Sequence, residues 1–167
     1  MRRRDFLLGL AVTPLAGAAS ARERAALPVQ APPGAVIVSM SQRRLFIALR
    51  DGTALSYRVA VGKPGKQWFG TRLIDGKHVW PAWGPPKEVK RDNPSLPDLI
   101  PGGAPNNPMG SRALTLAPGE YAIHGTTESM RRSIGSFASY GCVRMLNEDI
   151  EDLFERVRIG APVTMVR

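Results

Sequence analysis

A single cysteine, Cys142, and one of only two histidines, His124, are the residues of this chain best suited to covalent chemistry. A thiol attacks a carbonyl only as the thiolate, and it needs a neighbouring base or cation to supply that form at neutral pH. His124 follows the strand-like residues 121–123 and precedes Gly125, so its imidazole is expected to project from a strand end into a cleft. We therefore interpret Cys142 as the nucleophile and His124 as the base of a thiol enzyme.

The residues next to Cys142 are suited to support such an attack. Gly141 permits a tight turn that directs successive backbone amides at a developing oxyanion. Arg144 would project on the same side as Cys142 if this segment is extended, and its guanidinium could bind a substrate carboxylate. Taken singly, these residues also fit a buried cysteine, a hydrogen-bonded histidine and a solvated arginine, but their joint spacing favours catalysis.

The composition narrows the class of partner. The net charge of +9 at pH 7 favours anionic partners such as cell-wall polymers or a membrane surface. The basic residues are scattered, and no recognition helix or aromatic-basic motif accompanies them, so we expect no nucleic-acid partner. His78 is the second histidine, and two dispersed histidines with one thiol do not make a zinc ligand set. We therefore expect no metal site.

The first 21 residues have the pattern of an export signal. Residues 2–4 are arginines, residues 6–19 are apolar and small, and residues 19–21 offer a small-residue cleavage site before Arg22. Residues 3–7 also resemble the twin-arginine export signal of bacteria, the alternative being an ordinary secretory signal. The stretch is too short and too rich in small residues for a good spanning helix. We expect an exported protein of the periplasm or cell envelope, with no membrane span after signal removal.

The rest of the chain divides into a linker and one domain. Residues 22–34 contain several prolines and are predicted to be a tether. Residues 35–167 are long enough to bury a single core. Residues 36–38 and 45–49 predict a hairpin, because both runs are apolar and a short polar segment separates them. Further strands are predicted at residues 54–61, 71–74, 113–116, 121–123 and 162–166, with a turn at residues 75–76.

Two other segments have clear signals. Prolines recur through residues 80–110 and exclude long helices and central strands there. We interpret this segment as a functional loop, anchored in part by Trp80 and Trp83, rather than as a disordered one. A helix is predicted over residues 148–157, with Asn147 as its N-cap and an apolar stripe at helical spacing. The domain is therefore expected to be mainly β, with one helix in its C-terminal half and a long proline-rich loop.

Several of these residues also form a family signature. The run HGT at residues 124–126, Gly135, and the run SYGCVRM at residues 139–145 followed by NEDI at residues 147–150 occur in this order. Together they closely resemble the signature of bacterial L,D-transpeptidase catalytic domains of the YkuD or ErfK/YbiS type. The resemblance extends over essentially all of residues 35–167.

The resemblance implies a β-sandwich or barrel whose cleft holds the thiol. Cys142 would attack the carbonyl of the third residue, a diamino acid, of a peptidoglycan stem tetrapeptide, expel the terminal D-alanine and form a thioester. An amine would then resolve the thioester. That amine commonly belongs to a neighbouring stem, which gives a 3,3 crosslink, or to a lysine of an outer-membrane lipoprotein. No metal or organic cofactor is implied.

The resemblance also implies roles for individual residues. His124 would serve as base in one half-reaction and acid in the other. The amides around Tyr140, Gly141 and Cys142 would form the oxyanion hole. The implied substrate contacts are Gly125, Thr126, Tyr140 and Arg144.

The chain departs from the family at Tyr140, where histidine is usual. If that histidine orients the catalytic base, this chain needs a substitute, and the Ser139 hydroxyl or a nearby carbonyl is the candidate for orienting His124.

Two other functions are kept as alternatives. A hydrolytic L,D-carboxypeptidase would use the same site and let water resolve the thioester. A non-catalytic module that binds the cell wall would carry the same residues with an inert thiol.

Overall fold

The computed structural model describes residues 22–167, so the export signal predicted for residues 1–21 lies outside the described residues. The strands are β1 (Glu23–Ala25), β2 (Val36–Ser39), β3 (Arg44–Ala48), β4 (Ala54–Arg58), β5 (Val61–Gly62), β6 (Gly70–Val79), β7 (Arg112–Ala117), β8 (Tyr121–His124), β9 (Phe137–Ser139), β10 (Val143–Arg144) and β11 (Pro162–Val166). The helices are α1 (Lys87–Asp92), the 3-10 helix η1 (Glu128–Ser133) and α2 (Asn147–Arg156).

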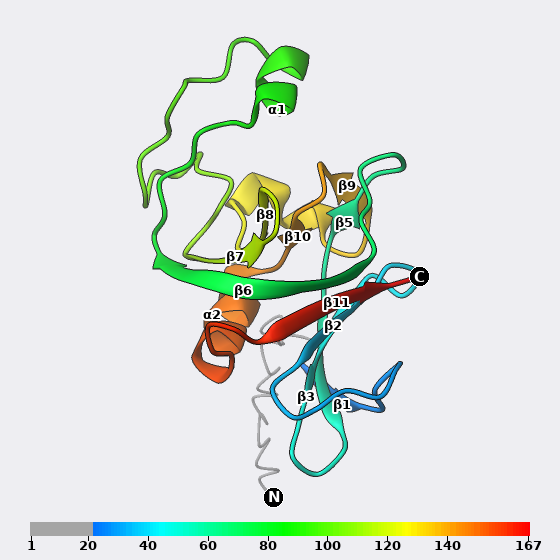
Figure 1. Ribbon diagram of the computed structural model, residues 1–167. Helices are drawn as coiled ribbons and strands as arrows, with labels where there is room; N and C mark the ends of the chain where they lie inside the picture. Colours follow the sequence, from blue (N-terminus) through cyan, green and yellow to red (C-terminus); the bar gives the residue numbers. More distant parts are fainter. Residues whose placement is uncertain (1–21) are drawn as a thin grey trace, which may run out of the picture.

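Nine of the strands form one sheet in the order β1-β4-β3-β2-β11-β6-β7-β8-β10, and β5 pairs with β9 in a second, two-stranded sheet. The C-terminal strand β11 lies between β2 and β6, parallel to β2 and antiparallel to β6. Figure 1 shows β6 crossing the middle of the molecule, with α2 below it. The predicted mainly β fold with few helices is confirmed. No helix within residues 22–167 is long and apolar enough to cross a membrane.

One hydrophobic core holds the main sheet and α2 together. Ile150, Leu153 and Phe154 form the predicted apolar stripe of α2, and all three are buried with residues of β2, β3, β7, β8 and β11. Burying each of these side chains stabilises the fold by about 1.5–3 kcal/mol. The packing fixes α2 against β7 and β8, and it thereby holds the short segment that leads from Cys142 into the helix.

Residues 75–76 do not form the predicted turn. They lie inside β6, and the pairing of β6 with β7 continues on both sides of a register shift between Ile74 and Gly76. A β-bulge of this kind inserts an extra residue into one strand without ending the strand. The prediction was wrong because pairing with β7, which lies beyond the proline-rich segment, outweighs the local turn preference of Asp-Gly.

Residues 22–34 are not the unstructured tether that their prolines predicted. Residues 23–25 form β1, the edge strand that pairs antiparallel with β4. Leu27 and Ala31 pack on a second small core around Phe46. The prolines at residues 28, 32 and 33 are tolerated because they follow β1 and lie in the connection to β2, outside both strands. The segment therefore belongs to the folded domain.

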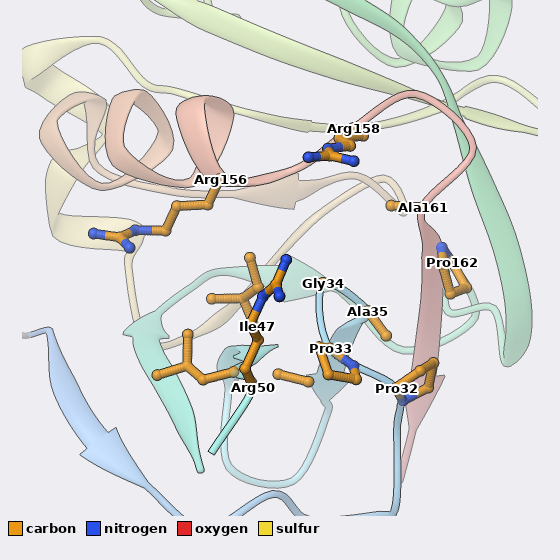
Figure 2. A pocket seen from close by; sticks show the side chains of 12 residues that line it. Pro32, Pro33, Gly34, Ala35, Ile47, Arg50, Arg156, Arg158, Ala161 and Pro162 are labelled. Atoms are coloured by element: carbon orange, nitrogen blue, oxygen red, sulfur yellow. The ribbon is translucent and has the colours of Figure 1, made fainter. Parts of the chain in front are cut away.

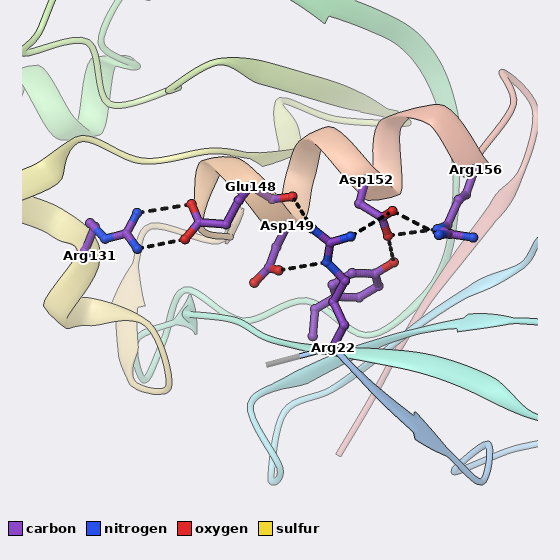
Figure 3. Close-up of polar contacts among 7 residues, drawn as sticks. Arg22, Arg131, Glu148, Asp149, Asp152 and Arg156 are labelled. Atoms are coloured by element: carbon purple, nitrogen blue, oxygen red, sulfur yellow. Dashed lines mark hydrogen bonds and ion pairs between the residues drawn. The ribbon is translucent and has the colours of Figure 1, made fainter. Parts of the chain in front are cut away.

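Arg22, the first described residue, binds α2 through ion pairs and a hydrogen bond. Figure 3 shows Arg22 lying across the acidic side of the helix, where its Nη2 donates to the Glu148 carbonyl at 3.2 Å and its Nη1 lies 3.1 Å from Asp152. Tyr57 donates its hydroxyl hydrogen to Asp152 at 2.7 Å, and Arg131 forms two hydrogen bonds with the Glu148 carboxylate. These contacts hold α2 on the side away from its apolar stripe.

Helix α2 begins one residue earlier than predicted. Asn147 is its first residue and Leu146 occupies the N-cap position, without a side-chain capping hydrogen bond. The prediction of Asn147 as N-cap was wrong because its side chain is engaged elsewhere, with backbone groups of residues 111 and 126.

The proline-rich residues 80–110 connect β6 to β7 as an ordered loop that carries α1 (Figure 1), and this loop is called the excursion below. Trp83 and Ile100 exchange two backbone hydrogen bonds at its neck, of 2.8 and 2.7 Å. The Asn107 side chain donates to three carbonyls of the same excursion, those of Pro81, Ile100 and Pro101. Trp80 does not anchor the segment by burial, because its side chain is 52% exposed. The segment is thus ordered mainly by backbone hydrogen bonds.

Candidate active site

Strand pairing brings the two predicted catalytic residues to the same edge of the sheet. β8 and β10 are parallel neighbours, with Ile123 opposite Val143 and His124 opposite Arg144. Cys142 directly precedes β10, so the thiol and the imidazole belong to adjoining strand ends. The sequence predicted this proximity from the types and spacing of the residues, and the register of β8 and β10 supplies the physical reason.

Cys142 is a free cysteine and is half-buried. Burial raises the pKa of its thiol, and this effect outweighs the Ala122 backbone amide and the charge of Arg144, both of which favour the thiolate. The resting side chain is therefore a neutral thiol. To act as a nucleophile it would need a base.

His124 is suited to be that base. Its side chain is buried, 5% exposed, and its Nδ1 lies 2.8 Å from the Gly125 carbonyl oxygen. A carbonyl oxygen only accepts, so Nδ1 carries the hydrogen and Nε2 keeps the basic lone pair. Burial, and then the charge of Arg144, lower the pKa of His124 to about 4, although the carbonyls of Gly125 and Pro108 oppose the change. The imidazole is neutral at physiological pH and free to accept a proton.

The charge of Arg144 acts on both the His124 imidazole and the Cys142 thiol. Its positive charge lowers the pKa of His124 and that of Cys142, so it acts on both ends of the pair. Its Nη1 donates to Ser133 Oγ at 2.8 Å, and its Nε is buried without a hydrogen-bond partner in the described part of the chain. Within residues 22–167 it forms no salt bridge with a carboxylate. A half-buried guanidinium without a carboxylate partner is chemically suited to bind an anion.

Ser139 and Gly141 shape the loop that carries Cys142. Ser139 is buried, donates to the Cys142 carbonyl at 2.5 Å and accepts from the Gly141 amide at 3.1 Å. Of the two candidates for orienting His124, the nearby carbonyl, that of Gly125, bonds the ring, and Ser139 does not. The prediction of Gly141 as an oxyanion donor is corrected, because its amide is already engaged with Ser139. Gly141 has φ +121°, and a Cβ there would lie 2.5 Å from the Tyr121 ring. Only glycine fits this position without strain.

Gly125, which has no side chain, and Thr126 are both buried. Gly125 acts through its carbonyl, which holds His124. Thr126 is 1% exposed, and both its backbone amide and its backbone carbonyl bind the side chain of Asn147. Their predicted role as substrate contacts is corrected to a role in building the site. Asn147 was predicted only as an N-cap, and its role in the site was missed. The glycines at positions 110 and 125, which lie close to its side chain, were the signal that could have found it.

Tyr140, at the family's usual histidine position, reaches the proline-rich excursion instead of His124. Its hydroxyl donates to Asp92 Oδ2 at 2.8 Å, at the end of α1. The ammonium of Lys63 lies 3.7 Å from the centre of the Tyr140 ring, and Lys66 forms a salt bridge with Glu88, also on α1. Tyr140, then Arg91, lower the pKa of Asp92 and keep it charged. Tyr140 thus fastens α1 to the catalytic loop.

Tyr140→Phe is expected to loosen α1. Without the hydroxyl, the charged Asp92 loses its hydrogen bond to the catalytic loop, and the backbone amides of residues 87–92 should exchange with deuterium about fivefold faster. Tyr57→Phe is the matched control, because it removes a tyrosine hydroxyl that bonds Asp152 on α2 and not a residue of α1. Hydrogen exchange followed by mass spectrometry measures both variants. Equal exchange in Tyr140→Phe and wild type would rule out the fastening role.

One cavity of the protein lies away from these residues. It has a volume of about 570 Å³ and is bordered by residues 32–35, by residues 47–50, and by the chain around Arg156, Arg158 and Pro162, as Figure 2 shows. It contains no thiol, histidine or carboxylate, so it cannot perform the chemistry described above. No cluster of metal ligands occurs within residues 22–167, and the exposed His78 lies on β6, which β7 separates from His124 on β8.

Known proteins resemble this chain in both sequence and fold. Residues 33–165 match the family model YkuD, the L,D-transpeptidase catalytic domain. YbiS of Escherichia coli K12, a probable L,D-transpeptidase, is 35% identical over 148 residues, which cover 84% of this chain and 46% of YbiS. YqjB of Bacillus subtilis 168 is 40% identical over 134 residues, which cover 77% of this chain and 68% of YqjB. The chain spans about half the length of the E. coli relatives it matches.

A solved structure supports the fold. The NMR structure of the catalytic domain of the E. faecium L,D-transpeptidase, acylated by ertapenem, aligns with a TM-score of 0.61 at 15% identity. The alignment covers 83% of this chain and 100% of that domain. The family model spans the whole thiol site and nearly the whole sheet, and we conclude that this chain belongs to the L,D-transpeptidase catalytic domain family.

Proposed function

We propose that this protein is a peptidoglycan L,D-transpeptidase that acts through a Cys142 thioester on stem tetrapeptides. The observation that carries the proposal is the pairing of β8 with β10, which sets His124 opposite Arg144 and beside the turn that holds Cys142. The relatives named above carry the same family name, and the site has a nucleophile, a neutral base and an unpaired cation.

The first half-reaction starts from the neutral Cys142 thiol and the neutral His124 imidazole. His124 Nε2 takes the thiol proton as the sulfur attacks the carbonyl of the third stem residue, and a tetrahedral oxyanion forms. The oxyanion collapses to a thioester as the bond to the terminal D-alanine breaks, and the imidazolium returns its proton to the leaving amine. The backbone amides of Tyr140 and Cys142 are the donors proposed for the oxyanion, since the Gly141 amide is engaged with Ser139.

The second half-reaction reverses these roles. An incoming amine gives a proton to His124 as it attacks the thioester, and the departing sulfur takes the proton back. The acceptor we propose is the diamino acid of a neighbouring stem, which gives a 3,3 crosslink, or a lysine of an outer-membrane lipoprotein. Resolution by water would make the protein an L,D-carboxypeptidase. In either case the protein contributes to peptidoglycan biosynthesis and cell-wall organisation.

The proposed place of action is the periplasm or cell envelope. The arginine-led, apolar and small-residue pattern of residues 1–21 supports export, by the twin-arginine route or by general secretion. The basic chain, with net charge +9, also suits an anionic wall.

Product analysis tests the proposed reaction. The folded protein is incubated with purified stem tetrapeptide, with and without an added amine acceptor, and the products are identified by mass spectrometry. We expect release of D-alanine and a crosslinked product that grows with the acceptor. Tripeptide alone would indicate the carboxypeptidase, and unchanged tetrapeptide would favour the non-catalytic wall-binding module.

Arg144→Lys is expected to weaken substrate binding more than turnover. Lysine keeps the charge but loses the planar pair of donors that a carboxylate accepts, so KM for the tetrapeptide should rise about tenfold with a smaller change in kcat. Arg132→Lys is the control, because Arg132 is an exposed arginine of η1. Steady-state kinetics measure both variants. A KM equal to that of the wild type would exclude Arg144 as the carboxylate site.

A further inference from the structure

The side chain of Asn147 joins three segments of the site. Its Oδ1 accepts from the backbone amides of Ser111 at 3.1 Å and Thr126 at 3.0 Å, and its Nδ2 donates to the Thr126 carbonyl at 3.0 Å. Backbone N–H groups can only donate, so the orientation of the carboxamide is settled by its partners. One side chain at the start of α2 therefore holds both the end of the proline-rich excursion and the segment after His124.

The slot around Asn147 is shaped for a carboxamide by two glycines. A Cβ added at Gly110 or at Gly125 would lie 2.2 Å from Asn147 Oδ1, far inside van der Waals contact. Gly110 also has φ +65°, which other residues rarely adopt. The backbones of Gly110 and Gly125 both lie close to Asn147 Oδ1, so a larger residue at either position would displace the Asn147 side chain.

The bond from Asn147 to Thr126 acts directly on the group that orients the base. The Thr126 N–H and the Gly125 C=O belong to the same peptide unit, and that unit is planar. Fixing the direction of its N–H therefore fixes the direction of its C=O. That carbonyl accepts the hydrogen of His124 Nδ1 at 2.8 Å, and it thereby sets the tautomer and the orientation of the imidazole.

We propose that Asn147 is a positioning residue for catalysis: by holding the Gly125–Thr126 peptide, it aims the Gly125 carbonyl at His124 Nδ1 and thereby sets the direction of the opposite ring nitrogen, Nε2. This inference rests on the proposed role of His124 as the base. It supplies what Tyr140 does not, because a half-buried amide and a backbone carbonyl take the place of an orienting imidazole. Asn147 does not touch the reacting atoms.

The test follows the His124 imidazole by NMR. The chain has only two histidines, and the exposed His78 serves as an internal reference in every titration. In Asn147→Ala the Gly125 carbonyl is released and the ring can move toward water, so the pKa of His124 should rise from about 4 toward its ordinary value of 6.5. The rate of acylation by ertapenem, followed by intact mass, should fall about 30-fold.

Three further variants separate positioning from stability. Asn147→Asp keeps an oxygen for both amides and should acylate at least about tenfold faster than Asn147→Ala. Asn147→Ser, whose hydroxyl is too short to reach both amides, replaces Asn147→Ala if that variant does not fold. Tyr57→Phe is the stability control: it removes the 2.7 Å bond to Asp152 on the same helix. It should lower the melting temperature while the His124 pKa and the acylation rate stay at wild-type values.

The outcomes are distinct. A folded Asn147→Ala or Asn147→Ser with wild-type His124 pKa and acylation rate would overturn the proposal, as would an Asn147→Asp variant as slow as Asn147→Ala. If ertapenem fails to acylate even the wild type, the proposed function fails, and the NMR titration still decides whether Asn147 orients the ring.

Discussion

Cys142→Ala should reduce crosslinking of stem peptides by at least about 10⁴-fold, because the thioester cannot form without the sulfur. The folded core should survive, since Cys142 is half-buried and makes no disulfide. The measurement is the rate of crosslinked product by mass spectrometry, with the melting temperature as a check on folding.

Cys142→Ser is the matched companion to this variant. It keeps the size of the side chain and a hydroxyl, but an alcohol is far less ionised than a thiol at neutral pH, and it should be nearly as inactive as Cys142→Ala. Either variant retaining more than about 1% of wild-type crosslinking would argue against a covalent route through residue 142.

His124→Gln should slow the acylation step by about 10²- to 10⁴-fold, because glutamine can still bind the Gly125 carbonyl but cannot accept the thiol proton. His78→Gln, at an exposed histidine outside the site, is the control. Stopped-flow or rapid-quench measurement of ertapenem acylation separates this step from product release. A His124→Gln rate close to that of the wild type would assign the base to another group.

The pH dependence of wild-type acylation gives an independent view of His124. Burial lowers its pKa to about 4, so the imidazole is neutral and able to act as base above that pH, and becomes protonated and inactive as the pH falls through it. The acylation rate should therefore hold down to about pH 5, where a histidine of ordinary pKa near 6.5 would already have failed. An inflection near 6.5 would contradict the buried, neutral imidazole.

The sheet could be predicted where its strands have local patterns. The alternation through residues 54–58 and the apolar run of residues 45–48 each mark a strand, because burial on the core faces determines both. The bulge at residues 74–76 and the edge strand at residues 23–25 could not be predicted, because pairing with distant strands creates them.

The same distinction applies to the site. Cys142 and His124 stood out because their residue types are rare in this chain and their chemistry is specific. The contacts of Tyr140 with Asp92 and of Asn147 with Ser111 and Thr126 connect segments far apart in sequence, and an N-cap reading of Asn147 was locally reasonable. Ser139 was one of two candidates for orienting His124, the other being a nearby carbonyl, and the tight turn at Gly141 draws the Ser139 hydroxyl to the Cys142 loop.

The central claim is that the Cys142 sulfur is the acylated atom. The catalytic domain from E. faecium was solved in an ertapenem-acylated form, and the same probe applies here. Wild-type protein is incubated with ertapenem, its intact mass is measured, and the adduct is located by peptide mapping. We predict a single adduct on the peptide that contains Cys142, absent from Cys142→Ala. An unmodified wild type, or an equal adduct on Cys142→Ala, would contradict the account.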